Sequence, residues 1–190
     1  DIIVCIDVSN SMLAQDLSPN RLTRAKYALE KMIEGLEGDR FGLVIFAGEA
    51  YVQLPITTDY NAAKLFLESI NTGMVPVQGT NLASAIKKAS ESFSNDVGKN
   101  RAIILITDGE NHESEAVEAA EECAKKGIMI NTIGIGSSNG VPIPLVENGQ
   151  VKGYRKDREG QTVVTKLNSD LLKVIAGKAN GVYAVSYTHL

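Results

Sequence analysis

Three separate segments carry oxygen-bearing side chains of the types that a hard divalent cation prefers. In the first, Asp7, Ser9 and Ser11 fall on alternate residues of Asp-Val-Ser-Asn-Ser, and such alternation in an extended or turning loop can aim all three at one point. One carboxylate with two hydroxyls suits Mg²⁺ or Mn²⁺ better than zinc. Taken alone this motif favours an ordinary loop, because Asp, Ser and Asn are common turn and N-cap residues.

Two further segments offer matching chemistry. Thr80 directly precedes a helical pattern, and Asp108 follows the most apolar strand pattern of the chain. Thr80 could be a helix N-cap and Asp108-Gly109 could be a turn. However, two of the segments follow strands and the third precedes a helix, and all three are expected at the same edge, where open α/β sheets bind their ligands. We therefore favour one shared cation site over three unrelated turns.

The elements that would position these segments alternate along the chain. Apolar runs of strand length are separated by longer patterns of helical spacing, which indicates an α/β fold with a mainly parallel sheet. The predicted strands are 2–6, 41–47, 51–55, 102–107, 128–135 and 182–185. The predicted helices are 21–36, 61–70, 81–93, 113–126 and 170–178.

The lengths of the connections predict the topology. Residues 48–50 leave room only for a hairpin, so the third strand should be antiparallel and at the sheet edge, where Pro55 is tolerated. We predict a doubly wound, six-stranded sheet of order 3-2-1-4-5-6 with helices on both faces. Residues 138–166 break into short alternating pieces around two Gly-centred turns, which predicts a small β-hairpin insertion.

Composition limits the classes of function. The 190 residues, 44% of them hydrophobic, suffice for a single domain over residues 1–190. A net charge of −4 without a basic cluster argues against a nucleic-acid partner. Cys5 and Cys123 have neither disulfide-framework nor metal-ligand spacing, so we expect both to be buried as small apolar residues. Because both ends are abrupt, we expect a fragment of a longer protein.

The three polar segments resemble the metal-ion-dependent adhesion site of the von Willebrand factor A family. The matching positions are Asp7, Ser9, Ser11, Thr80 and Asp108. In that family the hydroxyls contact the ion directly or through water, the aspartates act largely through water, and one coordination position stays open. The resemblance implies a Rossmann-like fold, Mg²⁺ or Mn²⁺ ahead of Ca²⁺, and a protein partner that supplies an Asp or Glu to the metal.

Longer runs resemble the bacterial Bat (aerotolerance) subgroup of that family. They include residues 7–12, 16–22, 38–48 and 105–110, whereas the tail 186–190 does not match. The resemblance implies a protein anchored in the bacterial inner membrane, with this domain on the periplasmic side. It also implies partners among other Bat-like proteins and MoxR-type AAA+ ATPases.

An enzyme would need groups that this sequence lacks. His112 and His189 are its two histidines, neither stands in a Ser-His-Asp arrangement, and no Walker-type loop occurs. We therefore predict a non-enzymatic interaction module. A metal-assisted hydrolase and a structural domain with an unused site remain alternatives. We predict that His112 is solvated. Glu110 and Glu113 are expected to act as hydrogen-bond acceptors, rim charges or helix N-terminal charges, and Glu49 and Asp16 to help shape the rim.

Overall fold

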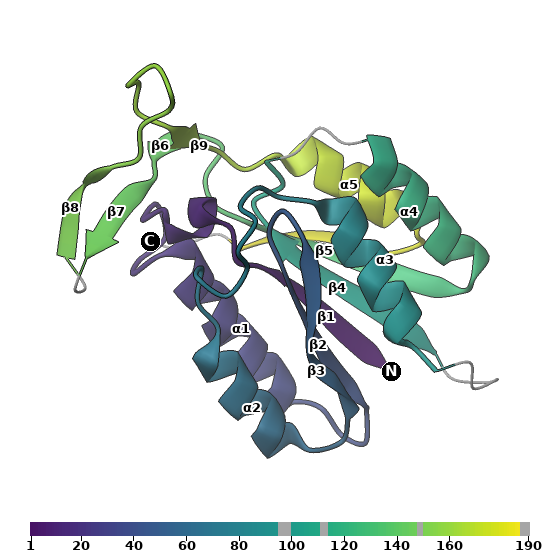
Figure 1. The fold of residues 1–190 in the computed structure, drawn as a ribbon. Helices are drawn as coiled ribbons and strands as arrows, with labels where there is room; N and C mark the ends of the chain where they lie inside the picture. Colours follow the sequence, from purple (N-terminus) through teal and green to yellow (C-terminus); the bar gives the residue numbers. More distant parts are fainter. Residues whose placement is uncertain (95–99, 111–113, 148–149, 187–190) are drawn as a thin grey trace.

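The computed structural model describes residues 1–94, 100–110, 114–147 and 150–186, and most of them fold around one six-stranded sheet (Figure 1). Its strands are β1 (Ile2–Asp7), β2 (Phe41–Phe46), β3 (Ala50–Thr57), β4 (Arg101–Thr107), β5 (Ile128–Ile135) and β10 (Tyr183–Ser186). They lie in the order β3-β2-β1-β4-β5-β10. Every pairing is parallel except that of β3, the edge strand that contains Pro55. The predicted strand order and antiparallel edge are confirmed.

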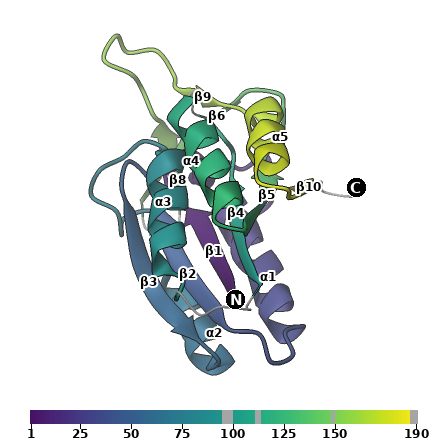
Figure 2. The ribbon, with the colours of Figure 1, turned by 90° about the vertical axis from the view of Figure 1, so that its right-hand side faces the viewer.

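Helices cover both faces of this sheet (Figures 1 and 2). They are α1 (Arg21–Glu34), α2 (Tyr60–Ser69), α3 (Leu82–Ser92), α4 (Ser114–Lys125), α5 (Ser169–Lys178) and the short 3-10 helix η1 (Asn10–Leu13). Successive residues of β1 face opposite sides. Ile3 and Cys5 pack in a core cluster with α3, α4 and α5, whereas Val4 and Ile6 pack with α1 and α2. Burial on both faces explains why the strand patterns are continuously apolar, and it confirms the doubly wound fold.

The insertion is more elaborate than the single predicted hairpin. Its strands are β6 (Val141–Pro142), β7 (Pro144–Glu147), β8 (Gln150–Tyr154) and β9 (Val164–Thr165). A β7–β8 hairpin lies inside an outer β6–β9 pair, and both pairs are antiparallel. Two-residue strands carry no readable alternation, so the sequence pattern could not reveal β6 and β9. Figure 1 shows the insertion projecting from the end of the sheet at which η1 lies.

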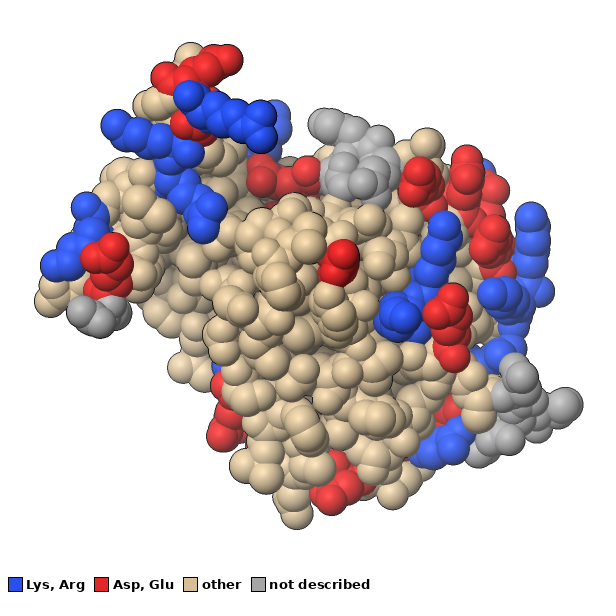
Figure 3. Space-filling model, in the orientation of Figure 1, with Lys and Arg blue, Asp and Glu red and all other residues tan. Residues whose placement is uncertain are grey.

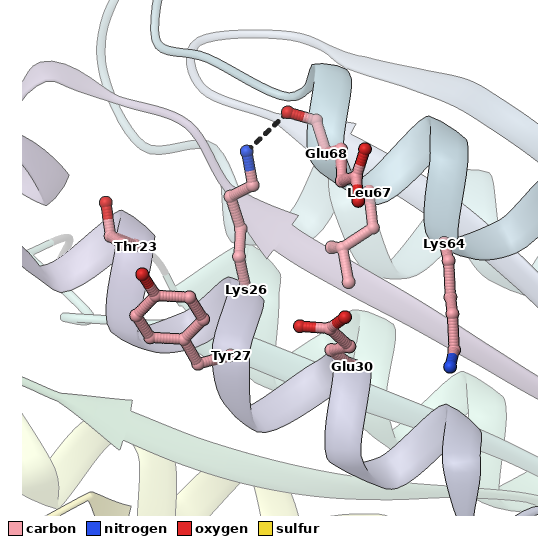
Figure 4. Close-up of a pocket in the computed structure, with 7 residues that line it drawn as sticks. All are labelled: Thr23, Lys26, Tyr27, Glu30, Lys64, Leu67 and Glu68. Carbon is pink, nitrogen blue, oxygen red and sulfur yellow. Dashed lines mark hydrogen bonds between the residues drawn. The ribbon is translucent and has the colours of Figure 1, made fainter.

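A crevice between α1 and α2 lies apart from the predicted site and shares no residue with it (Figure 4). Across it, the Lys26 ammonium donates to the main-chain oxygens of Glu68, at 2.6 Å, and Ile70, at 3.0 Å. Burial lowers the pKa of Lys26, because it disfavours the charged form. The crevice is therefore the packing seam of two helices. Among the described residues, no helix combines the length and apolar character that crossing a bilayer requires.

Candidate metal site

Asp7 is the last residue of β1, and its fully buried carboxylate is held by hydrogen bonds on both oxygens. The backbone N–H of Ser9 donates to Oδ1 at 2.8 Å, and the hydroxyl of Thr107, the last residue of β4, donates to Oδ2 at 2.6 Å. β1 and β4 are parallel neighbours, so their carboxyl ends meet at one edge. The carboxylate is thus fixed in orientation.

The two serine hydroxyls converge. Ser9 occupies the N-cap position of η1, but its side chain makes no capping hydrogen bond. Instead its Oγ lies 2.9 Å from Oγ of Ser11. The sequence did not predict η1, whose single tight turn carries Ser11 back toward Ser9. Both residues are buried, so the two hydroxyls are held next to each other and away from solvent.

Thr80 stands on a loop that is tied to the segment containing Asp7, Ser9 and Ser11. The backbone N–H of Asn10 donates to Oε1 of Gln78 at 3.1 Å, and that of Asn81 donates to the carbonyl of Ala47 at 2.7 Å. Asn81, whose Oδ1 accepts from the N–H of Ser84 at 2.7 Å, is the N-cap of α3. The alternative interpretation of Thr80 as that cap is therefore wrong.

Asp108 directly follows β4 and is as buried as Asp7. Its Oδ2 accepts a hydrogen bond from Nη1 of Arg21 at 2.8 Å. The next residue, Gly109, has φ +68°, so a left-handed turn does occur here, as the alternative interpretation held. The left-handed turn at Gly109 and the buried carboxylate of Asp108 therefore occur together.

The buried carboxylates of Asp7 and Asp108 lie close enough for their charges to interact, and Arg21 forms an ion pair with Asp108. Burial, and then the charge of Asp108, raise the pKa of Asp7 to about 7, although hydrogen bonds from Ser9 and Thr107 oppose the shift. Arg21 pairs with Asp108, and among the described residues Asp7 has no ion pair. The arrangement leaves negative charge that a bound cation would neutralise.

The donor set fits a hard ion and not a soft one. It consists of hydroxyls and two carboxylates, which are the ligands that Mg²⁺ and Mn²⁺ accept. Within the part of the chain that the structure describes, no group of three or more His, Cys, Asp or Glu side chains is arranged so that it could hold a metal ion. A zinc site of the usual His and Cys type is thus not formed by those residues.

The predicted rim residues have different surroundings. Glu110 accepts a hydrogen bond from the N–H of Lys166 at 2.8 Å, and burial raises its pKa. Glu49 is exposed and accepts a hydrogen bond from the Tyr51 hydroxyl. Asp16 is partly buried and forms an ion pair with Arg21 at 2.7 Å. His112 and Glu113 lie outside the described residues.

Sequence reasoning missed Arg21 as a site residue. Its side chain is fully buried beside Asp108, although it begins a helix in which charged residues would normally face solvent. Helical spacing places Arg21 on the same face as Ala25 and Leu29, both core residues. That spacing was the signal that could have found it.

The loop that carries Thr80 depends on a glycine. A Cβ at Gly48 would lie 2.8 Å from the carbonyl oxygen of Gln78 and 2.9 Å from that of Val77. Gly48→Ala should therefore push this loop away and lower the free energy of unfolding by about 1–3 kcal/mol, as overpacking does. Urea denaturation measures the change. Gly153→Ala, where a Cβ would meet nothing within 4 Å, should change it far less; equal effects would contradict the role of close packing.

The fold and the edge geometry define a doubly wound domain with a polar site at the carboxyl ends of its parallel strands. A family model for the von Willebrand factor type A domain matches residues 2–110, and the chain belongs to that family. Domains of this family are typically protein-interaction modules.

Two similar solved structures indicate the subgroup of the family that this chain resembles. BatB from Bacteroides thetaiotaomicron is 47% identical with a TM-score of 0.93, over 97% of this chain and 89% of that one. An aerotolerance-related membrane protein from Bacteroides fragilis is 45% identical with a TM-score of 0.93, over 98% and 91% of the two chains. The predicted resemblance to Bat proteins is confirmed.

More distant relatives include longer proteins and a protein with an occupied metal site. A curated protein of Mycolicibacterium paratuberculosis is 28% identical over 95% of this chain, which spans only 54% of that protein. This chain thus covers about half the length of the curated relatives it matches. A mussel byssus proximal thread matrix protein, described with a zinc-occupied adhesion-site motif, is 25% identical with a TM-score of 0.58, over 70% of this chain and 37% of that one.

Proposed function

We propose that this domain binds a protein partner through a divalent cation. The observation that carries the proposal is the buried pair Asp7 and Asp108 together with the adjacent hydroxyls of Ser9 and Ser11, where the described residues provide an ion-pair partner for Asp108 and none for Asp7. Two buried carboxylates so close are costly unless a cation offsets them. Mg²⁺ or Mn²⁺, ahead of Ca²⁺, would be held by Ser9, Ser11 and Thr80 with the help of the two aspartates.

The partner would supply an Asp or Glu side chain. A bound dication with few direct protein carboxylates keeps enough positive character to attract an external carboxylate. The insertion strengthens this expectation. Residues 138–166 hold five Lys or Arg and three Asp or Glu in a chain of net charge −4. Figure 3 shows basic side chains gathered over this insertion, and it adjoins the site because Thr165 contacts Asp108. An acidic partner surface would complement both features.

The metal site is tested by Mn²⁺ titration of the native chain and Asp7→Asn, with isothermal calorimetry or the electron paramagnetic resonance of free Mn²⁺ as the measurement. Asp7→Asn keeps the shape of the side chain, and we expect it to weaken binding by about tenfold or more. Asp39→Asn makes the same chemical change at an exposed residue and should leave binding unchanged. Binding that survives Asp7→Asn would exclude this site.

Family resemblance extends the proposal to the cellular setting. The partner would be another Bat-like protein or a MoxR-type AAA+ ATPase, and the full-length protein would be anchored in the bacterial inner membrane with this domain in the periplasm. Support comes from the similarity to the membrane protein of Bacteroides fragilis. Protease accessibility in spheroplasts tests the side of the membrane. Mg²⁺-dependent capture of a partner by the native chain, compared with Asp7→Asn, tests the association.

Two alternative functions predict different results. A metal-assisted hydrolase would turn over phosphate esters in a Mg²⁺-dependent way that Asp7→Asn abolishes. A structural domain with an unused site would show no change in thermal stability with Mg²⁺ or Mn²⁺. The proposed interaction module predicts metal-dependent stabilisation without turnover.

A further inference from the structure

The Arg21 guanidinium is a fully buried cation that joins four segments of the chain. Nε and Nη2 donate to the two oxygens of Asp16 at 2.9 and 2.7 Å. Nη1 donates to Oδ2 of Asp108 and to Oγ1 of Thr165, both at 2.8 Å. The backbone N–H of Ser137 completes the network by donating to Asp16 at 2.7 Å. One side chain thus ties the start of α1 to the ends of β4 and β5 and to the root of the insertion.

The surrounding backbone is shaped to receive this guanidinium. A Cβ at Gly136, just after β5, would lie 2.7 Å from both Cζ and Nε of Arg21. A side chain there would displace the guanidinium. The planar guanidinium of Arg21 donates to Asp16 through two nitrogens and to Asp108 through Nη1. A lysine ammonium cannot reproduce this geometry.

A contribution to the stability of the fold is not a sufficient reason for a buried arginine at this position. A buried ion pair is often no more stabilising than well-packed apolar side chains of similar volume. The network does, however, determine how the Asp108 carboxylate lies: Oδ2 is held by Arg21 and Thr165, and Oδ1 faces the backbone N–H of Glu110 at 3.4 Å.

We propose that Arg21 is the positioning residue of the metal site, fixing the Asp108 carboxylate and offsetting part of its negative charge. This inference rests on the proposed metal-binding function. By neutralising Asp108 in part, Arg21 leaves the ion more of its own positive charge with which to hold an external carboxylate. Loss of a group that orients a metal ligand typically lowers metal affinity by about 10-fold to 100-fold.

Mn²⁺ titration of the folded native chain, Arg21→Lys and Arg24→Lys tests the proposal. Arg21→Lys keeps the charge and loses the fork, so we expect Mn²⁺ affinity to fall about 10-fold to 100-fold. Arg24→Lys is the matched control, because Arg24 is exposed on the same helix, and it should bind as the native chain does. A merely structural role would lower the unfolding temperature of Arg21→Lys without changing the dissociation constant of its folded form.

Thr165→Val provides a second variant if Arg21→Lys does not fold. It removes the hydroxyl between Arg21 and Asp108 while keeping the shape of the side chain, and we expect a loss of affinity of about tenfold, because both hydrogen-bond partners of this hydroxyl are charged. Native affinity in a folded Arg21→Lys, or in Thr165→Val where Arg21→Lys does not fold, would overturn this inference alone. A native chain that binds no Mn²⁺ would overturn it together with the proposed function.

Discussion

In the presence of EDTA, Asp7→Asn should be more stable than the native chain at pH 8, and Mg²⁺ should reverse the order. The buried Asp7 carboxyl has a pKa raised from its ordinary 3.8 to about 7, by burial first and then by Asp108. Asparagine at this position carries no charge to bury. The substitution that removes metal binding should therefore stabilise the metal-free fold, as often happens at functional sites.

The direction of the pH dependence follows from proton linkage. Between pH 4 and 7 the folded chain keeps a proton on Asp7 that the unfolded chain has lost, so the contribution of Asp7 to stability falls as the pH rises through that window. Over that window the contribution of Asp7 to the free energy of unfolding falls by on the order of 2–4 kcal/mol. A bound dication favours the charged carboxylate, so Mg²⁺ should stabilise the native chain more at pH 8 than at pH 5.

Urea denaturation at several pH values, with EDTA or Mg²⁺, measures both effects. The relevant quantity is the difference between the native chain and Asp7→Asn, because other groups titrate as well. Burial acts against the charge of Asp16, but hydrogen bonds from Arg21 outweigh it and lower the pKa of Asp16, which gives stability that is lost in acid. Asp39→Asn should keep the native profile. Parallel curves for the native chain and Asp7→Asn from pH 4 to 8 would contradict the expectation.

The main sheet could be predicted from sequence because its signal is local and repeated. Ile103 and Leu105 face one core cluster and Ile106 faces the other, so β4 reads as an unbroken apolar run. The short connection between β2 and β3 determined the antiparallel edge. The β6–β9 pair carried no such signal, since it joins residues more than twenty positions apart through two-residue strands.

The site was less accessible to sequence reasoning because its contacts are distant along the chain. The five oxygen-bearing residues were predicted from their types and from family resemblance. The full burial of Asp7 and Asp108 was not predicted, because residue type and spacing do not report it. Thr165 approaches Asp108 only through the insertion, and no local pattern reports such a contact.

Gly181→Ala should be among the most destabilising single substitutions in the described chain. Gly181 lies between α5 and β10 and its N–H donates to the carbonyl of Ala176 at 2.9 Å. A Cβ there would overlap the carbonyl oxygen of Ile130 and lie 2.5 Å from its carbonyl carbon. Since backbone of β5 cannot move aside as a flexible side chain can, we expect a loss of about 3 kcal/mol or more in the free energy of unfolding.

Gly177→Ala is the matched control, because it makes the same change four residues earlier, on an exposed position of α5 where a Cβ meets nothing within 4 Å. It should stabilise the chain by about 1 kcal/mol, the cost of glycine inside a helix. Opposite signs for the two variants in urea denaturation would locate the effect in the close approach of Gly181 to β5.

The close approach of Gly181 to β5 also positions α5. The residue before α5, Asn168, donates its N–H to the carbonyl of Asp108 at 2.8 Å. Gly181→Ala should consequently weaken Mn²⁺ binding as well, whereas a destabilised variant with native affinity would show that α5 and the metal site are independent.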